Sequence, residues 1–241
     1  MKLIFTLLLG LAASTVMAQE LRVLSGGAAK SLVDPLAASF RGAKVQMDYQ
    51  PMGRLVKSLE EGAQVDMVIV TEETLPALER QNRVSRGAKP IARVGIGVAV
   101  NEKAPLPDIS TVEAFKRTLL AAKSIVYIDP KVGTSGKHVA EVLQRLGIAE
   151  QVNAKAKLGQ GGYIVEPVGR GEIELGIHQI SEILPVKGVK LVGELPKELQ
   201  KYTVYVAVPV TQSRAVLDFI DHLTGPEARK RLAQAGYSAP E

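Results

Sequence analysis

The 241-residue chain contains no cysteine, carries a formal net charge of +5 and is only 4% aromatic. The absence of cysteine excludes disulfides, thiolate nucleophiles and sulfur-ligated metals. The basic residues are scattered and aromatic residues are scarce, which argues against a nucleic-acid-binding surface and is compatible with a small anionic ligand.

The N-terminus has the pattern of a secretory leader. Lys2 precedes the apolar run "LIFTLLLGLAA", which is too short to span a bilayer. Val16 and Ala18 stand at the minus-three and minus-one positions of a cleavage site. We therefore predict a signal peptide over residues 1–18 and a mature periplasmic protein over 19–241. A buried N-terminal helix is the alternative interpretation.

The first half of the chain alternates short strand patterns with helical ones. The strands "LRVL", "KVQMDY" and "VDMVIV" are each followed by a helical pattern, the first of these over about 29–40. Such βαβ alternation predicts a parallel sheet covered by helices. Residues 94–100 form a long strand pattern without a following helix, and Ser110 and Glu113 have the spacing of a capping box.

The second half repeats the alternation. "SIVYI" precedes a loop and the amphipathic helix "KHVAEVLQRLGI", a short helix with Pro167 in its first turn precedes the strand "IELGIH", and residues 202–210 form another long strand. Two helices end the chain. We predict an α/β protein with two lobes, 19–97 plus 206–241 and 98–205, each a mainly parallel sheet flanked by helices. Strands 94–100 and 202–210 would cross between the lobes and act as a hinge. The ligand cleft would lie between the two lobes.

The loop "SGGAAKS" raises the question of a phosphate site. A nucleotide P-loop requires glycine directly before its lysine, but Ala29 stands before Lys30, so ATP binding is not expected. Gly26 and Gly27 would allow close approach of a ligand to the backbone, helix-start amides are free donors, and Ser25 adds a hydroxyl. The loop is therefore a candidate anion site or, alternatively, a plain strand-to-helix turn.

A similar strand–loop–helix element lies in the second lobe. Thr134, Ser135 and Gly136 stand at the predicted start of a helix, where hydroxyls and free amides gather. The stretch narrowly misses the G-x-S-x-G nucleophile elbow, because its second glycine comes one place early. The histidines at 138, 178 and 222 have neither triad nor metal-pair spacing, so no metal or cofactor is expected.

Further polar residues follow other predicted strands. Gly53 and Arg54 stand at a third helix start, Thr71 ends the strand "VDMVIV", and Gln179 ends "IELGIH" beside His178. Ligands of open α/β sheets bind outside the carboxyl ends of strands, which makes these residues candidates for the same cleft. Arg54 is alternatively a solvated side chain, and His178 a satisfied core histidine.

The sequence resembles the molybdate-binding type of periplasmic solute-binding protein. The similarity lies in "LRVLSGGAAKSLVDPLAASF", "DMVIVTEETLPALERQNRV", "IDPKVGTSGKHVAEVLQRLGI", "VGRGEIELGIHQISEI" and "LTGPEARKRLAQAGY". The resemblance implies a type II binding-protein fold and places Ser25 where members supply a hydroxyl to the oxyanion. Pro51 and Met52 stand where molybdate binders show serine, and Gln179 stands near a usual tyrosine.

The departures from the family pattern shift the expected ligand. Two hydroxyls are missing and an arginine is added, and guanidinium groups pair well with planar carboxylates. We therefore expect a monomeric binding protein that delivers an organic carboxylate, or an oxyanion such as molybdate, to an ABC importer. A similar scaffold is used by periplasmic aconitate isomerase, so an isomerase of di- or tricarboxylates is the alternative, with Lys30, His178 or Glu166 as proton carrier. A sensor module without a transported ligand is the third hypothesis.

Overall fold

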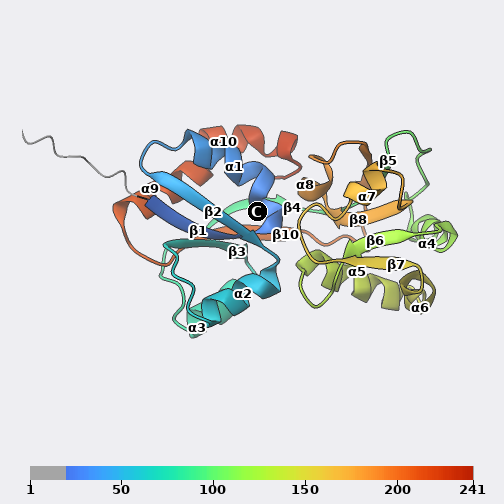
Figure 1. Ribbon diagram of the computed structural model, residues 1–241, viewed down its shortest axis with the longest axis horizontal. Coiled ribbons are helices and arrows are strands. Elements are labelled where there is room, and N and C mark those ends of the chain that lie inside the picture. The colour runs from blue at the N-terminus through green and yellow to red at the C-terminus, as the bar shows by residue number, and fades with distance from the viewer. Residues whose placement is uncertain (1–19, 241) are drawn as a thin grey trace, which may run out of the picture.

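The computed structural model describes residues 20–240, which form two α/β lobes side by side (Figure 1). The predicted leader lies outside the described residues. None of the helices in the described range is long and apolar enough to cross a membrane.

The first lobe is built on a five-stranded sheet of order β2-β1-β3-β10-β4. Helices α1, α9 and α10 cover one face of this sheet, and α2 and α3 the other (Figure 1). Its strands are β1 (Glu20–Gly26), β2 (Lys44–Gln50), β3 (Met67–Thr71), β4 (Lys89–Val94) and β10 (Thr203–Pro209). Its helices are η1 (Gly27–Ala29), α1 (Lys30–Ser39), α2 (Met52–Glu60), α3 (Leu75–Arg80), α9 (Arg214–Thr224), α10 (Pro226–Arg231) and η2 (Ala233–Ala235).

The second lobe repeats this plan with the strand order β7-β6-β8-β5-β9. Its strands are β5 (Ile96–Asn101), β6 (Ile125–Ile128), β7 (Ala156–Gly159), β8 (Leu175–Gln179) and β9 (Val189–Glu194). Its helices are α4 (Val112–Ala121), α5 (Thr134–Arg145), α6 (Ala149–Asn153), α7 (Glu166–Gly169) and α8 (Ile180–Ile183).

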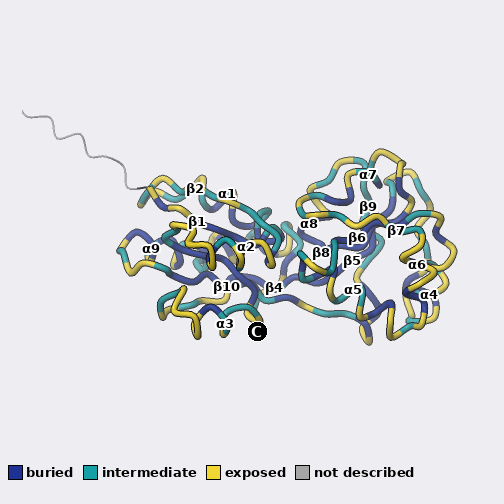
Figure 2. The backbone as a smooth tube through the Cα atoms, turned by 60° about the horizontal axis from the view of Figure 1, so that its bottom comes forward, coloured by how far each residue is buried: buried dark blue, intermediate teal, exposed yellow. Residues whose placement is uncertain are grey.

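The central strands of each lobe are buried on both faces (Figure 2). In β6, Ile125 and Tyr127 join the core cluster that includes Phe115 of α4, whereas Val126 and Ile128 join a second cluster on the other face. This alternation follows from the two-residue period of a strand. It explains why "SIVYI" is a continuous apolar run rather than an alternating one.

The sheets are mainly parallel, as predicted, but each contains one reversed strand, so that four of its five strands run in the same direction. In each described sheet, two strand pairings are parallel and two are antiparallel. The antiparallel pairings belong to β10 in the first lobe and β5 in the second. Each of these strands follows a crossing between the lobes and inserts into its sheet against the direction of its neighbours.

The chain crosses between the sheets at Gly95 and again between Glu194 and Thr203. Residues 94–100 are therefore not one strand: Val94 ends β4, and β5 starts at Ile96. The predicted lobe boundaries at 97/98 and 205/206 fall inside β5 and β10. The two crossings are tied together by Gln200, whose side chain accepts from the Ile96 amide at 3.0 Å and donates to the Ile96 carbonyl at 2.9 Å.

The N-cap of α4 differs by one residue from the predicted capping box. Thr111 is the cap, and its hydroxyl accepts from the Ala114 amide at 3.1 Å. Ser110 instead donates its hydroxyl to Asp108 at 2.7 Å. Two adjacent residues of the sequence S-T-V-E carry hydroxyl groups. The first, Ser110, is hydrogen-bonded to Asp108 in the preceding turn, so the second, Thr111, caps the helix.

Candidate functional site

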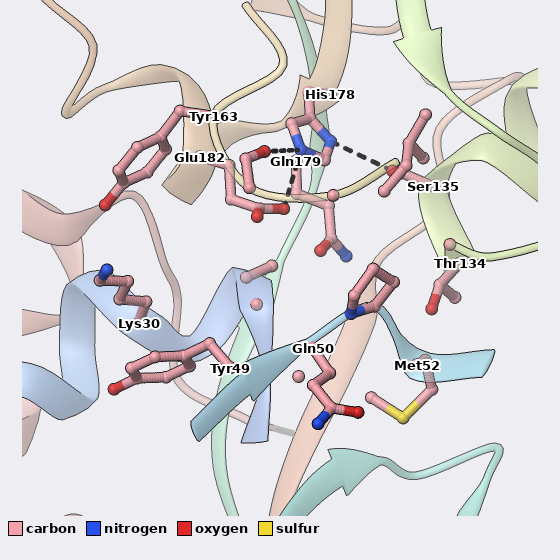
Figure 3. Close-up of a pocket in the computed structure, with 18 of the residues that line it drawn as sticks. Lys30, Tyr49, Gln50, Met52, Thr134, Ser135, Tyr163, His178, Gln179 and Glu182 are labelled. Atoms are coloured by element: carbon pink, nitrogen blue, oxygen red, sulfur yellow. Dashed lines mark hydrogen bonds and ion pairs between the residues drawn. The ribbon is translucent and has the colours of Figure 1, made fainter. Parts of the chain in front are cut away.

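A cavity of about 220 Å³ lies where the two lobes meet (Figure 3). The first lobe contributes the end of β1, the start of α1 and the segment between β2 and α2. The second lobe contributes the start of α5, the loop before α7 and the end of β8 with α8. The residues lining the cavity include Gly26, Gly27, Lys30, Tyr49, Met52, Thr134, Ser135, Gly162, Tyr163, His178, Gln179, Glu182 and Tyr205.

Gly26, the last residue of β1, and Gly27, the first residue of η1, have close neighbours from both lobes. A Cβ atom on Gly26 would lie 2.7 Å from Cε of Met52 and 2.8 Å from a ring carbon of Tyr205. A Cβ atom on Gly27 would lie 3.1 Å from Glu182 Oε1 of the second lobe. The absence of side chains at these two positions therefore lets polar groups of both lobes approach the same space.

The start of α5 supplies hydroxyls and free amides. Gly133 is the extended N-cap, and the Lys137 amide donates to its carbonyl at 3.1 Å. The amides of residues 134–136 precede that bond and have no acceptor within the helix. A Cβ atom on Gly136 would lie 2.0 Å from the Ile128 carbonyl oxygen, so only glycine allows the helix to pack this closely on β6.

His178 occupies the wall of the cavity between a hydroxyl and a carboxyl group. Its Nδ1 lies 3.2 Å from Ser135 Oγ, and its Nε2 lies 3.0 Å from Glu182 Oε2 (Figure 3). The side chains of His178 and Glu182 are only 1% and 7% exposed. The buried carboxyl group therefore has an imidazole nitrogen as a close polar neighbour.

Gln179 carries an unused donor at the cavity. Its Oε1 accepts a hydrogen bond from the Tyr205 hydroxyl at 3.1 Å. Its Nε2 is buried and has no hydrogen-bond partner within residues 20–240. Buried amide groups without a partner are costly, and such a group in a native protein calls for a ligand or water to satisfy it.

Lys30 brings a positive charge to the opposite side of the cavity (Figure 3). Its Nζ lies 5.4 Å from the ring centre of Tyr49 and 5.8 Å from that of Tyr163. These rings hold the ammonium group by cation–π attraction. Burial, followed by the hydrogen bond to Asp34, raises the pKa of Tyr49 above its usual range, and burial likewise raises that of Tyr163, so both phenols stay neutral donors.

The structure brings seven of the predicted site residues to this cavity. They are Gly26, Gly27, Lys30, Thr134, Ser135, His178 and Gln179. Six others do not line it: Ser25, Gly53, Arg54, Thr71, Gly136 and Glu166.

Three of these six are occupied by structural contacts. Ser25 is fully buried and donates to the Gly26 carbonyl at 3.1 Å, and the Thr71 hydroxyl lies 2.7 Å from that of Thr74. Gly136 packs on β6.

The other three lie outside the cavity. The Gly53 amide donates across the lobes to the Val132 carbonyl at 3.2 Å. Arg54 follows it on α2 with an exposed side chain, and Glu166 is an exposed neighbour of Arg170 on α7. The positive charge expected from Arg54 is supplied in this cavity by Lys30.

Tyr49, Tyr163, Tyr205 and Glu182 were missed by the sequence reasoning. Glu182 had a usable signal, because it follows His178 by four residues just beyond the end of β8. The tyrosines gave no such signal. They enter the cavity from three separate elements, and only the closure of the lobes brings them together.

The lobes contact one another directly beside the cavity. Ser181 of α8 donates its hydroxyl to the Ala28 carbonyl of the first lobe at 2.8 Å. The Tyr205–Gln179 and Gly53–Val132 bonds also cross between the lobes. The two lobes are therefore joined directly beside the cavity, and hydrogen bonds to a charged ligand are stronger where water is excluded.

The structure identifies no metal centre. Within the described part of the chain, no group of three or more His, Asp or Glu side chains is placed to hold a metal ion.

Residues 21–238 match the family model described as bacterial extracellular solute-binding protein. An aconitate isomerase from Pseudomonas sp. is 30% identical over 229 residues, covering 90% of this chain and 86% of the relative. The molybdate-binding protein ModA of Azotobacter vinelandii is 26% identical over 250 residues, covering 98% and 96%.

The fold is also that of a solved structure of this kind. The periplasmic molybdate-binding protein of Azotobacter vinelandii superposes with a TM-score of 0.77 at 18% identity, covering 92% of this chain and all of that one. At this identity the likeness shows the shared type II fold and leaves the ligand open.

Proposed function

Because the chain belongs to the bacterial extracellular solute-binding proteins, we infer that its interlobe cavity binds a small organic carboxylate. The observation that carries this proposal is the buried Nε2 of Gln179, which lines the cavity without a partner among the described residues. An anionic oxygen is the acceptor that would satisfy it best, since hydrogen bonds to charged groups are the stronger ones.

The remaining donors favour a carboxylate over a compact oxyanion. The hydroxyls of Thr134 and Ser135 and the free amides of α5 stand on one side of the cavity, and Lys30 stands on the other (Figure 3). A molecule with separated anionic groups would engage both sides. A tetrahedral dianion such as molybdate is usually held by neutral donors alone and remains the alternative ligand.

Delivery to an ABC importer in the periplasm is the role we assign to this binding. It rests on the family and on the closed two-lobe arrangement, because domain closure around a ligand is how such folds respond to binding. The predicted leader over residues 1–18 would direct export.

A ligand panel tests the proposal. The mature protein is melted with di- and tricarboxylates, molybdate, tungstate and sulfate. At a hundredfold excess over Kd, a ligand adds about 2.7 kcal/mol of stability, roughly 5–10 °C for a domain of this size. We expect a carboxylate to give this shift. A shift by oxyanions alone would overturn the preference for a carboxylate.

A second candidate function is an isomerase that moves a proton within a bound di- or tricarboxylate. Two observations support it: the titratable pair His178 and Glu182 lines the cavity, and one relative is an aconitate isomerase. Incubation of the bound carboxylate, followed by NMR detection of product, separates this candidate from a binder.

A further inference from the structure

Ser135, His178 and Glu182 form a continuous chain of polar contacts along the wall of the cavity, in which Ser135 is hydrogen-bonded to His178 and Glu182 lies at ion-pair distance from it (Figure 3). They come from α5, β8 and α8, and they are 3%, 1% and 6% exposed. The sequence spacing does not predict the contact between Ser135 and His178, because these residues are 43 positions apart.

The contacts of the imidazole fix the position of its hydrogen. Nε2 faces two acceptors, Glu182 Oε2 at 3.0 Å and the Gly162 carbonyl at 3.3 Å. A carbonyl and a carboxylate have no hydrogen to give, so Nε2 carries it. Nδ1 faces the Ser135 hydroxyl, which can either donate or accept. Nδ1 is therefore the ring nitrogen that can gain a proton while every contact is kept.

Glu182 has no role in simple capture of an anion. Its carboxyl group places negative charge on the wall of a cavity whose other groups suit an anionic ligand, and like charges repel. Paired with His178, however, it would stabilise an imidazolium formed during a reaction, as the third member of a catalytic triad does.

We propose that Ser135, His178 and Glu182 carry the proton in an allylic isomerisation of an unsaturated di- or tricarboxylate. This deepens the second candidate function and rests on carboxylate binding at Gln179. The substrate has a methylene group next to a carbon–carbon double bond.

In the first step, a methylene C–H bond breaks and its electron pair enters the conjugated system that ends on a carboxylate. The proton goes to Ser135 Oγ while the serine hydrogen passes to His178 Nδ1. In the second step, the same chain returns one proton to the far carbon of the allylic system. A C–H bond forms there, the double bond has moved, and no oxidant, reductant or second substrate is consumed.

The three residues have different roles. Ser135 lines the cavity and is the catalytic residue that touches the substrate. His178 holds the proton between the two steps. Glu182 is a positioning residue, because it acts on the substrate only through the imidazole. Lys30, Tyr163 and Tyr205 also line the cavity, and they would bind and orient the substrate.

The test uses trans-aconitate in D₂O with the mature protein. NMR follows deuterium entry at the methylene and vinyl carbons and appearance of the cis isomer, and calorimetry measures binding in parallel. The variants are Ser135→Ala, His178→Gln and Glu182→Gln. His222→Gln is the matched control, because His222 lies on α9 and does not line the cavity.

We expect the wild type and His222→Gln to exchange and isomerise equally. His178→Gln and Ser135→Ala should slow both processes about 100-fold or more, with affinity kept within about tenfold, since general acid–base groups contribute 10²–10⁴-fold. Glu182→Gln should lower kcat while KM changes little, which a merely structural role would not produce.

Two negative outcomes are distinguishable. Heat of binding without deuterium entry, or exchange that survives in His178→Gln, overturns the proton chain and leaves the carboxylate site standing. No heat with any di- or tricarboxylate overturns the proposed ligand class and the proton chain together.

Discussion

The Tyr205 hydroxyl reaches from the first lobe and donates to Gln179 Oε1 of the second lobe at 3.1 Å. This bond orients the Gln179 amide so that its buried Nε2 is left for a ligand. The Gln179 side chain therefore both joins the two lobes and presents a donor to the cavity.

Loss of the Gln179 donor should weaken binding. In Gln179→Met the shape of the side chain is kept but Nε2 is gone. A hydrogen bond to a charged group contributes roughly 1.5–3 kcal/mol, so we expect about a 10- to 100-fold rise in Kd for the bound carboxylate by calorimetry. Tyr205→Phe keeps Nε2 and should cost less. An unchanged Kd in Gln179→Met would show that the amide does not face the ligand.

Lys30 and Arg54 should differ sharply in their effects. Lys30 lines the cavity, whereas the Arg54 side chain is exposed on α2. Lys30→Met should raise the Kd of the carboxylate at least about tenfold by removing a charge from the site. Arg54→Ala should leave it unchanged and serves as the control for loss of one positive charge. The reverse order of effects would refute this assignment of the charge.

Gly136→Ala should destabilise the fold. The new Cβ atom would lie 2.0 Å from the Ile128 carbonyl oxygen, which is backbone and cannot rotate away. We expect a loss of at least about 2 kcal/mol in urea unfolding, at the upper part of the range for overpacking. Gly193→Ala is the control, because the nearest atom to its Cβ would be 3.7 Å away. Equal stability of the two variants would contradict the packing of α5 on β6.

Alkaline pH should destabilise the protein through buried tyrosines. Burial raises the pKa of Tyr237 to about 12, and burial holds that of Tyr205 well above its usual range. In the unfolded chain these phenols ionise near pH 10. Their contribution to the free energy of unfolding is therefore complete below about pH 10 and is lost as the pH rises toward 12. For Tyr237 this loss is on the order of 2–3 kcal/mol.

Two measurements check the tyrosine prediction. Denaturant unfolding as a function of pH should show stability falling between about pH 10 and 12, and Tyr237→Phe should flatten that fall. Tyrosinate absorbance should show that Tyr205 and Tyr237 do not titrate while the protein is folded. If all six tyrosines titrated near pH 10 while the protein stayed folded, the prediction that burial raises the pKa values of Tyr205 and Tyr237 would be contradicted.

The sequence predicted the elements that have strong periodic patterns. The strands "LRVL", "VDMVIV" and "SIVYI" were identified because they are short runs rich in Val, Ile and Leu that are followed by helical patterns. Strands β4, β7 and β9 were missed: β4 contains Pro90, β7 is four residues long with two exposed side chains, and β9 is only partly buried. The crossing at Gly95 was hidden because apolar residues flank it on both sides.

Residues of the candidate site could be predicted only where the neighbouring sequence places them in the cavity. Loops after β1 and before α5 show their small and hydroxyl residues directly. Arg54 was chosen because it follows a helix start, but the rotation of α2 turns it outward. Lys30 is the first residue of α1 and directly follows the short turn η1, which begins at Gly27. Its place beside Tyr49 and Tyr163 depends on tertiary packing, which no local pattern records.

The central claim is that the interlobe cavity binds an organic carboxylate. Titration calorimetry of the mature protein against trans-aconitate, citrate and molybdate, with Gln179→Met alongside, tests it most directly. The account predicts saturable heat with at least one carboxylate, about 10- to 100-fold weaker binding in Gln179→Met, and no comparable heat with molybdate. Tight molybdate binding in both proteins, without heat from either carboxylate, would contradict it.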